Sequence, residues 1–150
     1  MKRAARIAVL LGLTFSAGLA PAHDDAYLDT QKAPNGGQLR MAGPYHFELV
    51  LAQDGGDLKT HPLVVHVTDH AGQKVPTAGA TGTATLLVGK QKASAVLKPD
   101  GDNRLKGFAR YAPAAGMKAV VSITLAGKPP EQARFTPAVP AMDPHAGHRH

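Results

Sequence analysis

Two stretches in the first half of the chain alternate apolar and polar residues with a period of two. Aromatic or aliphatic side chains occupy every odd position of residues 45–51 and of residues 63–67. This alternation is typical of a β-strand that buries one face and exposes the other. The polar sides of the two stretches, which we expect to face water, carry His46, Glu48, His66, Thr68 and His70.

An antiparallel hairpin centred near Asp57 would pair these two strands. In that register Glu48 lies opposite His66, while His46 lies opposite Thr68 and diagonal to both His66 and His70. Directly opposite Cβ atoms are about 4.5–5.5 Å apart and diagonal ones about 7–8 Å. Three imidazoles and one carboxylate would then converge on one metal ion. The alternative is that they are ordinary polar residues on a solvated sheet face, and a slip of one residue would turn them toward the core.

Further short strands are expected along the rest of the chain, separated by turns rich in Gly, Pro, Asp and Asn. Aromatic residues make up only 5% of the chain, whereas Gly (16) and Pro (12) are frequent, which favours an all-β domain over a helical bundle. Seven or eight short antiparallel strands suggest an immunoglobulin-like β-sandwich, with a small closed barrel as the alternative. The expected strands are 38–41, 45–51, 61–70, 83–88, 93–98, 104–111, 118–126 and 132–136.

The first 22 residues have the features of a cleavable secretory signal peptide. Lys2, Arg3 and Arg6 form a basic start, Ile7–Leu19 is apolar, and Ala20–Ala22 fits a cleavage site. The apolar run is too short and too interrupted to favour a transmembrane helix, so we expect a periplasmic protein without stable membrane insertion. Beyond it we expect a polar N-terminal segment (23–37), the sandwich (38–137) and a flexible His-rich tail (138–150).

Composition restricts the partners and the chemistry. Cleavage removes three of the 17 basic residues and none of the 11 acidic ones, so the net charge falls from +6 to +3. This scattered excess argues against binding nucleic acid. The chain has no Cys, which excludes thiolate metal sites and disulfides. It also lacks the G-x-S-x-G and H-E-x-x-H motifs, so we do not expect an enzyme.

Other histidines offer candidate metal ligands outside the hairpin. The tail contains His145, His148 and His150, and closely spaced imidazoles suit Cu(II), Zn(II) and Ni(II). A solvated tail without a role, or an expression tag, is the alternative. Cleavage after Ala22 would leave His23 as the N-terminal residue, whose α-amine and imidazole chelate Cu(II) as a pair; the alternative is a frayed terminus.

Methionines and one further histidine complete the set of candidate residues. Met41, Met117 and Met142 could supply soft thioether ligands to Cu(I), but they are too scattered to form a Met-rich motif, and Met117 is expected to pack in the core. His61, which precedes Pro62 at a strand edge, is expected to be exposed.

Three segments of the sequence resemble a known family. Ala33–Leu39, Gly43–Val50 and Val67–Pro76 are similar to segments of small periplasmic proteins associated with resistance to copper and other heavy metals. A similar module occurs at the N-terminus of some periplasmic adaptor subunits of resistance-nodulation-division metal efflux pumps. The resemblance covers roughly residues 33–136 and implies an immunoglobulin-like sandwich that handles metal. His46 and Glu48 match the family pattern, but the family often has His at the position of Asn35.

These observations predict a non-enzymatic periplasmic protein that binds a transition metal, foremost copper, with zinc and nickel as alternatives. It would buffer the ion or deliver it to a metal-efflux adaptor or pump. His46, His66 and His70 would be ligands, Glu48 a ligand or an orienting group, and the tail histidines would capture metal. The alternative function is a module that binds no metal and docks on an efflux or assembly complex of the cell envelope through an exposed strand edge.

Overall fold

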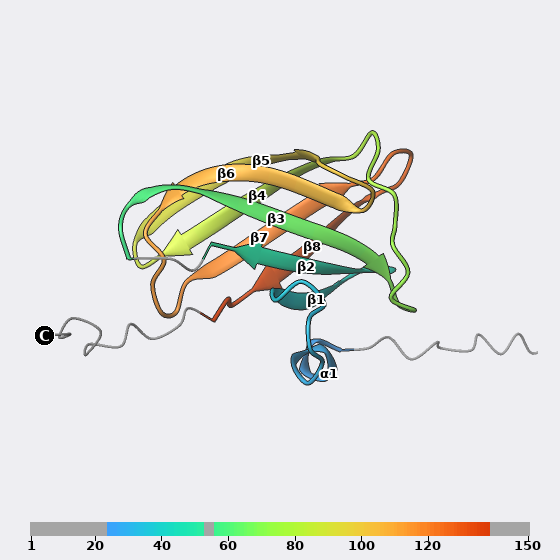
Figure 1. The fold of residues 1–150 in the computed structure, drawn as a ribbon, viewed down its shortest axis with the longest axis horizontal. Helices are drawn as coiled ribbons and strands as arrows, with labels where there is room; N and C mark the ends of the chain where they lie inside the picture. The colour runs from blue at the N-terminus through green and yellow to red at the C-terminus, as the bar shows by residue number, and fades with distance from the viewer. Residues whose placement is uncertain (1–23, 53–55, 139–150) are drawn as a thin grey trace, which may run out of the picture.

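The computed structural model describes residues 24–52 and 56–138 and arranges them as eight antiparallel strands in a nearly closed sheet (Figure 1). The all-β class is therefore confirmed. The spatial order of the strands is β1-β2-β3-β6-β5-β4-β7-β8. The elements are α1 (Asp25–Asp29), β1 (Gln38–Ala42), β2 (Tyr45–Leu51), β3 (Lys59–Asp69), β4 (Thr81–Val88), β5 (Gln91–Pro99), β6 (Arg104–Tyr111), β7 (Lys118–Thr124) and β8 (Pro130–Phe135).

The strands fold into two layers that enclose the core. β1, β2, β3 and β6 form one layer, and β5, β4, β7 and β8 form the other. At one side, β1 comes close to β8, where the backbone N–H of Thr136 donates to the Gln38 side chain at 2.9 Å. At the other side, β5 crosses from one layer to the other and pairs with β6 only at Lys98↔Lys106 and Pro99↔Leu105.

The hairpin of β2 and β3 has the register expected from the sequence. His46 lies opposite Thr68, and Glu48 lies opposite His66. Phe47 and Leu49 of β2 point into the core together with Leu63, Val65 and Val67 of β3, each at most 2% exposed. Their large apolar side chains hold the register, because a slip of one residue would move all of them to the outer face.

A short helix precedes the sheet, in a segment for which the sequence predicted only polar chain. Asp24 caps α1 by accepting a hydrogen bond from the backbone N–H of Tyr27 at 2.8 Å. The Asp29 carboxylate binds the Arg40 guanidinium of β1 at 2.6 Å, and the Asp25 side chain accepts from the backbone N–H of Met41 at 3.0 Å. These acidic side chains fasten the helix to the edge strand, beside which it lies in Figure 1.

Candidate functional site

The outer face of β2 is covered, contrary to the expectation that it faces water. His46 is 7% exposed and Glu48 3% exposed, although both alternate with core residues as predicted. The turn before β1 provides part of the cover. Because Leu39 of β1 lies opposite Glu48, the preceding residues 34–37 are carried past the Glu48 side chain.

Glu48 fastens this turn through both carboxylate oxygens. Oε1 accepts hydrogen bonds from the backbone N–H groups of Asn35 at 2.8 Å and Gly37 at 3.0 Å, and Oε2 accepts from the Asn35 side-chain amide at 2.9 Å. Hydrogen bonds to a carboxylate are stronger than those between neutral groups. Glu48 is thus an anchor for the N-terminal turn, a role that analysis of the sequence missed. The pairing of β1 with β2 was the signal that could have placed the turn beside it.

Two of the predicted imidazoles lie together. The rings of His46 and His70 stack with a centroid separation of 4.9 Å and an interplanar angle of 22°. The Nε2 atom of His70 is 3.2 Å from the carbonyl oxygen of Gly43, in the turn between β1 and β2. When Nε2 donates its proton to this carbonyl, the ring lone pair of His70 resides on Nδ1.

A methionine lies next to this pair of rings. Met41 of β1 is the direct partner of His46 in the β1–β2 register, and strand alternation places its side chain on the same outer face. Met41 is half-buried. Side chains opposite each other in an antiparallel pair have Cβ atoms about 4.5–5.5 Å apart. One thioether and two imidazoles therefore gather at the end of the sheet nearest the β1–β2 turn.

His66 lies farther along the same face, in a pocket of about 460 Å³. The pocket is lined by Glu48 and His46 as well as by Lys74 and Arg104. Burial lowers the pKa of His66 below its ordinary value, Arg104 and Lys74 lower it further, and Glu48 opposes them. The neutral imidazole, which is the form that binds metal, is thereby favoured at this position.

His61 is buried, so the expectation that it is exposed was wrong. It lies on the core-facing side of β3 and is only 2% exposed. Its ring packs against Tyr111 with centroids 4.7 Å apart and an angle of 46° between the planes. Met117, in contrast, packs in the core as predicted, at 1% exposure.

The described residues contain no group of three or more His, Asp or Glu side chains arranged to hold a metal ion. His46 and His70 are in contact, whereas Glu48 is engaged by the turn. His23, His145, His148 and His150 lie outside the described residues, as do the predicted signal peptide and most of the predicted tail. Within residues 24–52 and 56–138, none of the helical structure is long and apolar enough to cross a membrane.

Comparisons of the chain with family models, with curated proteins and with solved structures gave no match.

Proposed function

We propose that this protein binds copper in the periplasm, and that it buffers the ion or passes it to a metal-efflux system. The observation that carries the proposal is the stacked pair of His46 and His70, with Met41 opposite His46 on the adjacent strand. The geometry thus favours a narrower set of ligands than the four residues expected from the sequence. His66 and Glu48 would lie beside this set.

The donor types favour copper over harder ions. Thioether and imidazole ligands suit Cu(I), and imidazole alone also suits Cu(II), Zn(II) and Ni(II). The carbonyl of Gly43 lies where it can orient His70, as the outer hydrogen-bond partners of metal-binding histidines do. Two rings stacked as they are here would have to turn before the lone pairs of both could bind one ion. We therefore expect the metal-bound protein to differ from this structure in the side chains of His46 and His70.

Features of the sequence outside the described residues also support this function. The basic and apolar N-terminus has the pattern of a secretory signal, and His23 would become the N-terminal residue after cleavage. His145, His148 and His150 would capture metal before it reaches the folded site. The resemblance to periplasmic metal-resistance proteins is consistent with this role. The proposal includes an immunoglobulin-like arrangement of the strands.

Metal titration tests the proposal directly. The exported chain, residues 23–150, is titrated by calorimetry with Cu(II), Zn(II) and Ni(II), and with Cu(I) in competition with a coloured chelator. We expect copper to bind to the exported chain and to a chain that ends at Pro140, and the double variant His46→Gln/His70→Gln of the shorter chain to lose this binding.

Two further variants define the ligands. Met41→Leu preserves size and apolar character, so we expect it to weaken Cu(I) much more than Cu(II). His66→Gln removes an imidazole from the same face outside the stacked pair and serves as the matched comparison. Copper binding that is lost with the tail but unaffected by His46→Gln/His70→Gln would reject the folded site. The absence of copper binding by the full exported chain would reject the function.

A further inference from the structure

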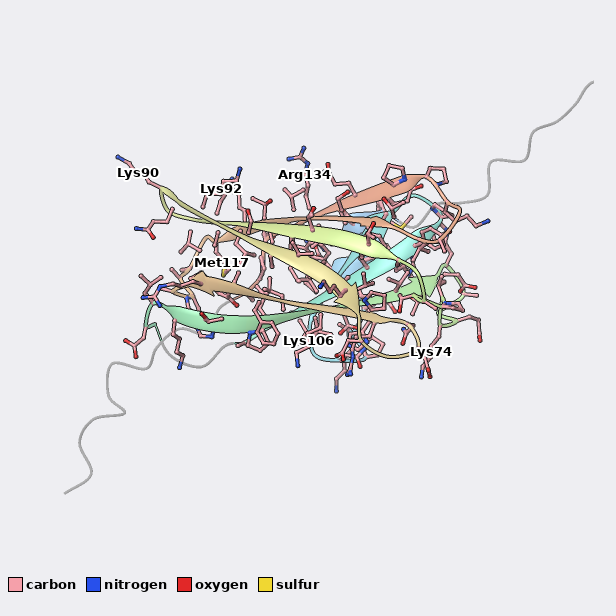
Figure 2. The ribbon with its side chains drawn as sticks, turned by 90° about the horizontal axis from the view of Figure 1, so that it is seen from above. Lys74, Lys90, Lys92, Lys106, Met117 and Arg134 are labelled. Carbon is pink, nitrogen blue, oxygen red and sulfur yellow. The ribbon has the colours of Figure 1, made fainter. Side chains whose placement is uncertain are left out.

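A pocket opens between β5 and β6, on the opposite side of the molecule from the β1–β8 contact. The two strands pair only near Lys98 and Lys106 and diverge toward the turn at Lys90, as Figure 2 shows. The pocket between the diverging parts has a volume of about 260 Å³. It is lined by Leu58, Val88, Gln91, Lys92, Ala93, Arg110, Tyr111 and Ala112.

The lining of this pocket combines an apolar interior with two cations. Lys92 extends from β5 on one side, and Arg110 belongs to β6 on the other, both exposed. None of the lining residues is acidic. Such a pocket is complementary to a ligand that has an apolar group for the cavity and negatively charged groups beside it for the two cations.

Exposed apolar side chains continue from the pocket along the outside of the two strands. Leu58 at the pocket is 49% exposed, Phe108 of β6 is 59% exposed, and Val96 of β5 is 66% exposed. Phe108 also lies opposite the exposed Pro62 of β3. Exposed apolar side chains that are neighbours, as Phe108 and Pro62 are, are characteristic of binding surfaces.

Cations accompany these apolar residues. The Lys106 ammonium lies over the Phe108 ring, 5.4 Å from its centroid, and Lys98 lies opposite Lys106. From the pocket to the paired end of the strands, the surface therefore alternates between apolar and basic side chains. A partner that is complementary over this length alternates apolar and acidic side chains, as an extended peptide with a period of two does.

We propose that the seam between β5 and β6 binds an extended acidic segment of a partner protein, with an apolar side chain of that segment in the pocket between Lys92 and Arg110. The concave pocket favours a peptide over an anionic lipid surface. A side chain of a peptide can enter the recess, whereas a flat bilayer would only lie across its opening. This inference concerns a different surface from the copper site and does not depend on metal.

The probe is a fluorescently labelled peptide of alternating leucine and glutamate, and binding is followed by anisotropy. We expect the peptide to bind, and its affinity to fall as the salt concentration is raised. In Lys92→Glu/Arg110→Glu the affinity should fall about tenfold or more. Lys128→Glu/Arg134→Glu is the matched control, because it reverses two exposed cations in the β7–β8 turn and on β8, which β4 and β7 separate from β5. A peptide with lysine in place of glutamate should not bind.

Three results would overturn the inference. The first is an unmeasurable affinity for the acidic peptide at low salt. The second is equal loss of affinity in Lys128→Glu/Arg134→Glu and in Lys92→Glu/Arg110→Glu, which have the same net charge; this would indicate attraction by net charge alone. The third is binding of phosphatidylglycerol vesicles, but not of the peptide, that disappears in Lys92→Glu/Arg110→Glu, which would assign the surface to a membrane. Circular dichroism checks that each variant is folded, and His46→Gln/His70→Gln should bind the peptide normally.

Discussion

Glu48 shows how a single buried carboxylate can hold the N-terminal turn against the sheet. In Glu48→Gln, the amide oxygen can keep the backbone N–H donors of Asn35 and Gly37 at the position of Oε1, but the new NH₂ group then faces the side-chain NH₂ of Asn35 where Oε2 accepted its hydrogen bond. We expect the free energy of unfolding to fall by about 1.5–3 kcal/mol, because buried donors lose a charged acceptor. Urea denaturation measures this loss.

The control for this prediction is a carboxylate in a different environment. Asp57 is exposed, so Asp57→Asn should change stability by less than about 0.5 kcal/mol. If Glu48→Gln were as harmless as Asp57→Asn, Glu48 would not anchor the turn.

At His66 the environment predicts the direction of a pH effect. Burial first, and then Arg104 and Lys74, lower its pKa in the folded protein below 6.5. Between the lowered pKa and about 6.5 the unfolded chain binds more protons at this site, so stability falls as pH decreases through that window. Proton NMR should show His66 titrating below 6.5, and His66→Gln should remove this part of the pH dependence.

The neighbouring charges permit a test of the cause. Lys74→Gln removes one of the groups that lower the pKa of His66, so this pKa should rise. Lys90→Gln, in the turn between β4 and β5, is the control and should leave it unchanged. A pKa of His66 at or above 6.5 in the native protein would contradict this account.

Alternation in the sequence was sufficient to predict which face of the sheet the side chains of β2 and β3 occupy, except at His61, which was expected to be exposed and lies in the core. It also predicted that Glu48 pairs with His66, because a register shifted by one residue would move the apolar side chains out of the core. The burial of His46 and Glu48 was not predictable in this way. It depends on the N-terminal turn, which reaches the face through the pairing of β1 with β2 and has no periodic pattern of its own.

At the scale of single elements, β3 places a histidine where a core residue belongs. The Nε2 atom of His61 is buried and has no hydrogen-bond partner among the described residues. Leaving such a group unsatisfied costs about 1–3 kcal/mol, which exceeds the contribution of about 0.5–1.5 kcal/mol from a ring contact such as that with Tyr111. His61→Leu should therefore be as stable as the native protein or up to about 2 kcal/mol more stable in urea denaturation.

Truncating the side chain at the same position should instead lower the free energy of unfolding. His61→Ala leaves a cavity beside Tyr111 and should lose about 2–4 kcal/mol. A loss of similar size in His61→Leu would show that the imidazole makes an essential polar contact.

Strands and helix differed in how well the sequence predicted them. All eight strands were expected within a few residues of their bounds, because most pair apolar alternation with a Gly, Pro or Asp turn. The helix α1 was missed because its five residues are too few for a helical pattern. Its position depends on Arg40, a tertiary partner that local sequence does not reveal.

At the scale of the whole molecule, the chain order of the strands is rearranged in space, and this was not predictable from local patterns. β6 lies between β3 and β5, so that the segment from β4 to β5 is enclosed by strands formed later in the chain. The non-local pairings of β3 with β6 and of β4 with β7 determine this arrangement. The two layers are also joined where β5 and β6, which are consecutive in the chain, cross.

Gly107 permits that crossing, and its replacement tests how the two layers are joined. A Cβ at Gly107 would overlap the carbonyl oxygen of Val96 and press on the Leu97 side chain. Because the obstacle is backbone, Gly107→Ala should force β5 and β6 apart, and we expect the free energy of unfolding to fall by about 2 kcal/mol or more.

Gly89→Ala is the control. A Cβ at Gly89 has open space around it, so the only cost is that of the positive φ of 60°, about 1–3 kcal/mol. The distinguishing measurement is amide hydrogen exchange: Gly107→Ala should accelerate exchange in the strands on both sides of the seam, whereas Gly89→Ala should affect mainly the β4–β5 turn. Equal exchange patterns in the two variants would mean that the layers are held together by the core alone.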